Sequence, residues 1–182
     1  MTRVSSLCFL AIFGTSLVSG CLVVKTPQIE TASSLIKSMF DQPLAEKKEQ
    51  ASKWSARVGS EGRLVEVVAQ DGFFVFFSSA GDAIAFDGWD VRSIIGFGAS
   101  DMRQIVVDGE RRQFRSGSDL SSTLCEGWKL DPDASSDDSK VWLQQCDGQV
   151  RANSIVVDSA GAISEISQVI DVNGTRAVLK RL

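Results

Sequence analysis

Short β-rich runs separated by Asp-Gly or Asn-Gly pairs fill the chain after residue 54 and limit the folds that it can adopt. Asp-Gly and Asn-Gly tolerate the positive φ angles of type I′ turns, so each pair predicts a β-hairpin. Several such pairs in one region predict a mostly antiparallel meander, and an open sheet of about ten strands is expected to curl into a barrel-like or folded-over form. The pairs are Asp71-Gly72, Asp87-Gly88, Asp108-Gly109, Asp147-Gly148 and Asn173-Gly174.

No long helical pattern lies between these turns, which excludes a doubly wound α/β fold. We therefore expect an all-β fold. The expected strands are Leu64–Val68, Phe73–Phe77, Ala83–Phe86, Val91–Phe97, Met102–Val107, Arg112–Arg115, Thr123–Leu130, Val141–Gln145, Ser154–Val157, Ile163–Ile170 and Ala177–Leu179.

One short helix is expected before the sheet. Six apolar residues between Ile29 and Phe40 recur at spacings of three and four, which predicts an amphipathic helix that ends near Pro43. We expect its apolar face to pack on the core of the domain, with docking to a partner as the alternative.

The N-terminus has the layout of a secretory signal, with Arg3, an apolar run over Leu7–Phe13 and small residues before Cys21. The stretch Leu17-Val18-Ser19-Gly20-Cys21 is typical of a lipobox, whose cysteine receives lipid before the peptide is cut ahead of it. The alternatives are a plain secretory signal and a transmembrane helix, but the apolar run is too short to span about 30 Å of hydrocarbon. The sequence thus predicts a lipoprotein signal peptide over residues 1–20, a lipidated tether over 21–28 and a single β-rich domain over 29–182.

Lipidation at Cys21 also predicts a location. Several acyl chains such as palmitate anchor a protein in effect permanently, because each buried methylene contributes about 0.8 kcal/mol. Leu22 follows the cysteine, where an aspartate would favour retention in the inner membrane. We therefore expect a lipoprotein of the bacterial outer membrane that faces the periplasm.

The remaining cysteines predict a disulfide. Cys8 leaves with the signal peptide and Cys21 carries lipid, so Cys125 and Cys146 form an even pair in an oxidising compartment. A metal-binding or redox pair is the alternative, but no C-x-x-C spacing and no further ligands accompany these cysteines.

Composition excludes several function classes. The chain contains no histidine and no tyrosine, so Ser-His-Asp and Cys-His mechanisms and imidazole zinc sites are excluded. Loss of residues 1–20 removes Arg3 and no acid, so the net charge changes from −4 to −5 and nucleic-acid binding is not expected. Alternating acids begin at Asp131, but Ser136 and Trp142 stand where a calcium loop needs glycine and glutamate. We expect no metal and no cofactor.

Three tryptophans, Trp89, Trp128 and Trp142, are candidates for contact with a glycan or a protein partner, since indole rings stack on sugar rings; the alternative is that they are core or rim aromatics. The chain has 23 acidic residues, and no spacing singles out a glycosidase pair, so no catalytic residue is predicted. The run Phe73–Phe77 is apolar on both faces, which predicts a strand buried on both sides or, alternatively, the lining of an apolar pocket in a lipid carrier.

Several stretches resemble a known family. Leu124-Cys125-Glu126-Gly127-Trp128, Lys140-Val141-Trp142 and the segment Ser154–Ile163 with Ser167-Gln168 are similar to the closing hairpins of the YjbF/GfcB-type lipoproteins, which are linked to group 4 capsule and exopolysaccharide production. The segment Ala83–Trp89 running into Ile94–Phe97 resembles the middle hairpin of that family. The resemblance implies a barrel-like periplasmic domain that assists polymer assembly or export and has no established active site.

These expectations combine into one functional hypothesis. The protein is expected to be a non-enzymatic outer-membrane lipoprotein that assists capsule or exopolysaccharide assembly or export by contact with the polysaccharide or with envelope secretion proteins. Two alternatives stay open, namely a lipid or lipoprotein carrier with an apolar barrel cavity, and a carbohydrate-active enzyme.

Overall fold

The computed structural model describes residues 53–182, which form thirteen β-strands and no helix. Within this range no helix is long and apolar enough to cross a membrane. The predicted signal peptide, Cys21, the tether and the amphipathic helix lie outside the described residues. The strands are β1 (Lys53–Val58), β2 (Glu61–Gln70), β3 (Phe73–Phe77), β4 (Ala83–Phe86), β5 (Val91–Ile95), β6 (Arg103–Asp108), β7 (Arg111–Ser116), β8 (Asp119–Leu124), β9 (Lys129–Asp131), β10 (Ser139–Gln144), β11 (Asn153–Asp158), β12 (Ile163–Val169) and β13 (Arg176–Arg181).

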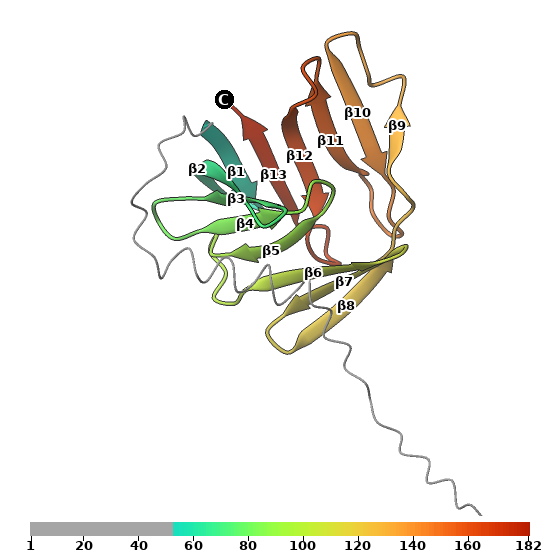
Figure 1. Ribbon diagram of the computed structural model, residues 1–182. Helices are drawn as coiled ribbons and strands as arrows, with labels where there is room; N and C mark the ends of the chain where they lie inside the picture. Colours follow the sequence, from blue (N-terminus) through green and yellow to red (C-terminus); the bar gives the residue numbers. More distant parts are fainter. Residues whose placement is uncertain (1–52) are drawn as a thin grey trace, which may run out of the picture.

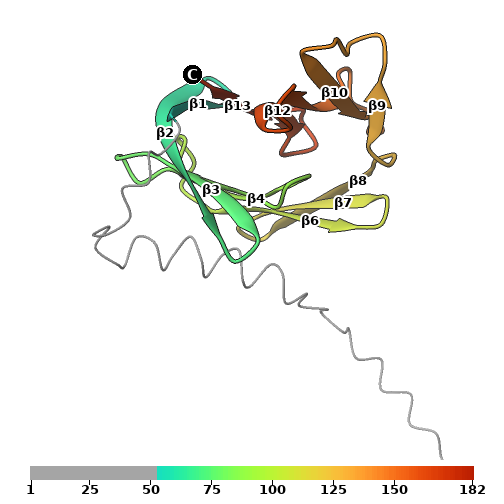
Figure 2. The same cartoon turned by 45° about the horizontal axis from the view of Figure 1, so that its top comes forward.

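All thirteen strands belong to one antiparallel sheet, which curls into a half-barrel (Figures 1 and 2). The sheet order is β8-β7-β6-β5-β4-β3-β2-β1-β13-β12-β11-β10-β9. The first eight strands form one arm and the last five form the other. The arms meet where β1 pairs with β13, from Trp54 opposite Arg181 to Val58 opposite Ala177; we call this pairing the ladder junction. The expected all-β, curled antiparallel fold is confirmed.

The predicted turns fall between paired strands, but most differ in type from the prediction. Each Asp-Gly or Asn-Gly pair lies at the turn between two consecutive strands that pair with each other, with Asp108 itself the last residue of β6. Only Asp71-Gly72 has two positive φ angles, of 47° and 83°, as a type I′ turn requires. At the other four pairs the glycine alone has a positive φ. In the β6–β7 hairpin, for example, Asp108 pairs with Arg111, so the two loop residues are Gly109 and Glu110.

Three strand predictions are wrong in detail. β1 was not expected from the sequence. The expected strand Thr123–Leu130 is two strands, because the chain leaves β8 at Cys125 to bridge with Cys146 and re-enters the sheet only at Lys129. The expected strand Val91–Phe97 ends at Ile95, because the next three residues all have positive φ angles.

The turn after β5 is stabilised by a buried carboxylate. Phe97, a buried non-glycine residue with φ of 52°, donates its backbone N–H to Asp82 Oδ1 over 2.7 Å. Asp82 Oδ2 accepts hydrogen bonds from Ser78 Oγ at 2.8 Å and from Arg63 Nε at 3.0 Å. Burial raises the pKa of Asp82, but these hydrogen bonds and the Arg63 charge bring the pKa below its ordinary value. The turn therefore holds an ionised carboxylate that satisfies the N–H of a left-handed residue.

The main hydrophobic core lies on the inner, concave face of the half-barrel. It draws on both arms, and its members include Trp54, Phe76, Phe86, Ile94, Ile105, Phe114, Ile155, Ile166 and Leu179. A second, smaller cluster contains Val75, Ala83 and Ala85. Phe76 belongs to the main core and its neighbour Val75 to the second cluster, so β3 is buried on both faces, as its sequence predicts.

Candidate functional site

The three tryptophans proposed as contact residues lie together in the structure. The ring of Trp89, in the β4–β5 loop, lies 5.8 Å from the ring of Trp128 and 5.3 Å from that of Trp142, measured between centroids. Trp128 and Trp142 are partly buried against the main core, whereas Trp89 is 45% exposed. The fourth tryptophan, Trp54, packs in the core against Phe76. We call Trp89, Trp128 and Trp142 the tryptophan cluster.

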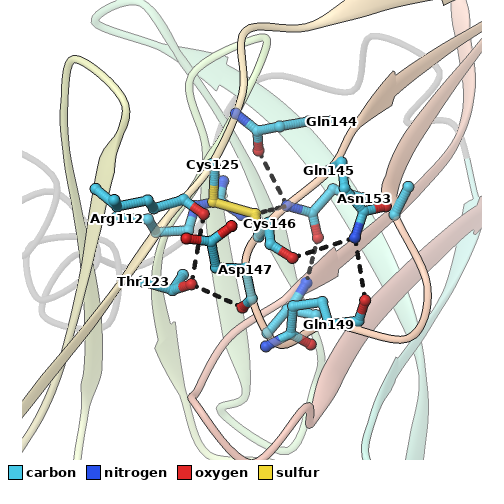
Figure 3. Close-up of a disulfide and its surroundings, with 12 residues drawn as sticks. Arg112, Thr123, Cys125, Gln144, Gln145, Cys146, Asp147, Gln149 and Asn153 are labelled. Atoms are coloured by element: carbon cyan, nitrogen blue, oxygen red, sulfur yellow. Dashed lines mark hydrogen bonds between the residues drawn. A yellow bond between two sulfur atoms is a disulfide. The ribbon is translucent and has the colours of Figure 1, made fainter.

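A disulfide between Cys125 and Cys146 lies close in sequence to two members of the cluster; Figure 3 shows the bond and its surroundings. Trp128 follows Cys125 by three residues, and Trp142 in β10 precedes Cys146 by four. Trp142 also pairs with Leu130 of β9. The pair expected from counting cysteines is thus bonded in the structure, and it ties both indoles to one region of the sheet.

The disulfide also connects the two arms, from the end of the edge strand β8 to a loop of the other arm. Cys125 comes directly after β8, and Cys146 lies in the β10–β11 loop. Two backbone hydrogen bonds of 2.8 Å flank the bond, from Glu126 N to Gln145 O and from Asp147 N to Leu124 O. We call this bridge and its hydrogen bonds the disulfide junction.

Side chains around the disulfide extend these contacts (Figure 3). Thr123 Oγ1 donates to Asp147 O at 3.0 Å, across the junction. Gln145 Nε2 donates to Cys146 O at 3.1 Å and to Gln149 O at 3.0 Å within the loop, and the buried Asn153 donates to Gln144 Oε1 at 3.0 Å. The loop that carries Cys146 is therefore ordered by its own amide side chains.

The loop that carries Trp89 is built on an aspartate turn. Asp87 Oδ1 accepts the backbone N–H of Trp89 at 2.9 Å and that of Asp90 at 2.7 Å, the pattern of an Asx turn. Arg92 Nε donates to Asp87 Oδ2 at 2.6 Å. The Asp-Gly pair here thus acts through its carboxylate, which fixes the backbone on both sides of the exposed indole.

A buried glutamine from the opposite arm holds the same loop. Gln168 of β12 donates from Nε2 to Trp89 O at 2.6 Å and accepts the N–H of Val91 at Oε1 over 2.9 Å. Arg112 of β7 also donates to Gln168 Oε1, at 3.0 Å, and forms an ion pair with Asp90. Arg112 is 1% exposed, so this network crosses the interior of the half-barrel and joins the two arms beneath Trp89.

Burial sets the electrostatics of this network. Desolvation raises the pKa of Asp90 more than the Arg112 guanidinium lowers it. Desolvation likewise lowers the pKa of Arg112, against the attraction of Asp90. Arg112 Nε and Nη1 and Trp128 Nε1 have no hydrogen-bond partner among residues 53–182. The ion pair is therefore a costly one whose geometry depends on the packing around it.

The sequence did not single out Arg112, Asp90 or Gln168 as parts of the site. A signal for Arg112 exists in the alternation of β7, where Arg112 and Phe114 share the inner face. For Gln168 the sequence contains no comparable signal, because its partners lie 56 and 77 residues away along the chain.

Other candidate features have local roles. Asp131 Oδ1 accepts the backbone N–H groups of Asp133 and Ala134, and Asp131 O accepts the Ser135 hydroxyl. Among the described residues no group of three or more acidic or cysteine side chains is placed to hold a metal ion. The tryptophan cluster thus presents one exposed indole, that of Trp89, on a loop that hydrogen bonds with Asp87 and Gln168 hold in place.

The fold is similar to that of a solved bacterial protein. No protein-family model and no curated protein matches the chain significantly. The crystal structure of the hypothetical lipoprotein YmcC from Escherichia coli K12 superposes with a TM-score of 0.51, at 12% sequence identity, over 87% of this chain and 96% of that one. At this identity, what the likeness establishes is that the two chains share an architecture.

Proposed function

We propose that this protein is a non-enzymatic lipoprotein of the bacterial outer membrane that faces the periplasm and assists capsule or exopolysaccharide assembly or export. The tryptophan cluster would be the surface that contacts the polysaccharide or an envelope secretion protein. The sequence supports this proposal through the lipobox at Cys21 and the resemblance to the YjbF/GfcB-type lipoproteins. The shared architecture with a protein described as a hypothetical lipoprotein adds support.

The observation that carries the proposal is that the exposed indole of Trp89 stands on a loop whose backbone is fixed by hydrogen bonds. An indole that stands 45% exposed leaves apolar surface in water, which contact with a sugar ring or an apolar partner would remove. The hydrogen bonds of Trp89 to Asp87 and Gln168 fix the loop in advance. Little conformational entropy would then be lost on binding.

Intrinsic fluorescence provides a direct binding test. The chain has four tryptophans and no tyrosine, and only Trp54 lies outside the cluster. In a Trp54→Phe variant, the indole emission would come from the tryptophan cluster alone. Titration with purified surface polysaccharide from the producing cell is expected to shift or quench this emission in a saturable way. Trp89→Ala in the same background should weaken the binding.

A cellular test separates this function from the alternatives. Surface polysaccharide is compared among cells that carry the wild-type gene, a deletion, Cys21→Ser or Trp89→Ala, with the amount of each variant protein confirmed. The deletion should lose polymer, and neither variant should restore it fully. Polymer unaffected by the deletion would contradict the proposed function. Acyl chains co-purifying with the protein would then favour a lipid carrier.

A further inference from the structure

The outer face of the half-barrel carries one apolar patch. Its side chains come from β2 to β5 and pack on one another, forming the second hydrophobic cluster. The strands pair directly there, with Val75 between Val68 and Ala85, and Ala83 between Phe77 and Ile95. We define the outer patch as Val68, Phe73, Val75, Phe77, Ala83, Ala85 and Ile95.

Polar residues bound the outer patch on both sides. On β1 the buried Trp54, Ala56 and Val58 face the main core, so the alternating residues Ser55 and Arg57 face outward. On β7 the inner residues Arg112 and Phe114 alternate with Arg111, Gln113 and Arg115 in the same way. The clustered apolar side chains therefore all come from β2–β5, which lie side by side along one wall (Figures 1 and 2).

The small side chains of this face are almost inaccessible. Val75 and Ala83 are 1% exposed and Ala85 is 0% exposed. Ser93 pairs with Ala85 and so shares its face; it is 1% exposed, and its hydroxyl has no hydrogen-bond partner among residues 53–182. The convex face of a sheet of small residues is normally open to water unless another element covers it. This burial points to a covering segment.

The register shows where the preceding chain reaches the sheet. Lys53, the first residue of β1, pairs with Glu66, and Glu66 pairs with Phe77 of the outer patch. Adjacent strands lie about 4.8 Å apart, so residue 53 lies about 10 Å from Phe77 and about 19 Å from Ile95 at the far end of the same row. The chain before residue 53 therefore meets the sheet beside the outer patch.

We propose that the amphipathic segment 29–40 docks as a helix on the outer patch. A helix of this length spans about 18 Å. The four strands β2–β5 span about 14 Å between their axes, so the helix matches the width of the patch. Residues 41–52 can bridge up to about 40 Å, far more than the distance required. The apolar stripe of Ile29, Ala32, Leu35, Ile36, Met39 and Phe40 supplies the surface that the patch lacks.

Docking orients the half-barrel on its anchor. Eight residues, 21–28, would separate the lipidated cysteine from the helix, a reach of about 28 Å at most. The outer patch would then lie on the membrane side of the domain. The tryptophan cluster belongs to the opposite, inner face and would be directed away from the bilayer.

Thiol labelling tests the docking. In residues 21–182 with Cys21→Ser and an intact Cys125–Cys146 disulfide, Ser93→Cys places a single free thiol beneath the proposed helix. This thiol should react slowly with a maleimide. Met39→Glu puts a carboxylate on the apolar stripe and should speed labelling by about tenfold or more, because a buried side chain of that size no longer stabilises the docked state. Ser34→Glu adds the same charge to the opposite face of the helix and should leave the rate unchanged.

Each of the other outcomes overturns the proposal. Rapid labelling of the thiol without any change in segment 29–40 would show that the patch is uncovered. Slow labelling that Met39→Glu does not change would show that another element covers it. If labelling becomes slower as the protein concentration rises, a second copy of the protein covers the outer patch. If labelling is slow only when phospholipid vesicles are present, the bilayer covers it. Ala83→Cys serves as a second reporter if Ser93→Cys impairs folding, which circular dichroism detects.

Discussion

Two of the contacts that join the arms of the half-barrel differ in kind. At the ladder junction, β1 and β13 pair over five consecutive positions, although Trp54 and Arg181 stand at opposite ends of the described chain. At the disulfide junction the only paired residues are Cys125 and Cys146, which are 21 residues apart. One junction depends on a long hydrogen-bonded strand pair, and the other on a covalent bond with two backbone hydrogen bonds.

The difference indicates a division of roles. The ladder junction lies over the main core, with Ala56, Ala177 and Leu179 buried beneath it, so burial of apolar surface stabilises it. At the disulfide junction the two cysteines are buried but belong to neither hydrophobic cluster, and the neighbouring Leu124 is 49% exposed, so less apolar burial stabilises it. The tryptophan cluster belongs to the second junction. We infer that the ladder junction fixes the fold, whereas the disulfide junction fixes the candidate contact surface.

The largest effect is expected from Arg112, which links the arms through the interior between the two junctions. Arg112→Ala leaves Asp90 buried without its counter-charge, and losing one partner of a buried ion pair typically costs about 3–5 kcal/mol. The free energy of unfolding from urea denaturation measures the loss. Arg111→Ala, at the exposed neighbouring position, is the control and should change stability by less than about 0.5 kcal/mol. A similar small loss for Arg112→Ala would show that the arms do not depend on this internal link.

The ladder junction is tested next by Leu179→Ala. Leu179 is 0% exposed in the main core, and truncating a buried leucine costs roughly 2–5 kcal/mol through lost burial and the cavity that remains. The same urea titration should show one cooperative transition at a lower midpoint, with native tryptophan emission unchanged. Lys180→Ala, which is exposed on the same strand, is the control. A change in tryptophan emission without a change in the unfolding midpoint would contradict the inference that the ladder junction fixes the fold.

Loss of the disulfide junction should have the opposite signature to Leu179→Ala: the native tryptophan emission should change before the protein unfolds. Replacing both Cys125 and Cys146 by serine removes a loop constraint worth about 3 kcal/mol in the chain-entropy model. Because Trp128 and Trp142 flank the bond, their emission should shift to longer wavelength in the native state, before global unfolding. Reduction of the wild-type protein with a thiol should reproduce the shift. Unchanged emission in both experiments would show that the cluster does not need the disulfide.

Much of the fold could be predicted from local sequence, but not the ladder junction. The bounds of β3 and β4 agree with the prediction because each is a continuous apolar run closed by turn residues. The pairing of β1 with β13 depends on contacts between chain ends, which no local pattern encodes. β1 itself was missed, because its six residues include Lys53 and Arg57, whose outward positions dilute the apolar signal.

The sequence predicted which residues belong to the candidate site, but not that the fold brings them together. Counting cysteines identified the disulfide partners, and composition singled out the tryptophans. Their proximity follows from the chain leaving β8 at Cys125, where the sequence instead predicted one continuous strand. The buried Gln168 shows the limit most clearly, since a glutamine in a strand is ordinarily a solvent-facing residue and here supports a loop of the opposite arm.

The smallest effect compares one side-chain hydrogen bond at each junction. Thr123→Val keeps the side-chain shape and removes the 3.0 Å bond to Asp147 O, which should cost about 0.5–1 kcal/mol. Ser55→Ala removes the longer 3.4 Å bond to Lys180 O across the ladder junction and should cost close to zero, because five paired positions hold that junction regardless. In the protein without its disulfide, the cost of Thr123→Val should rise, since the hydroxyl then supports one of the few remaining links between the arms. Equal costs with and without the disulfide, measured as a double-mutant cycle, would mean that Thr123 and the covalent bond act independently. The disulfide junction would then depend on the covalent bond alone, with no cooperation between that bond and the hydrogen bonds beside it.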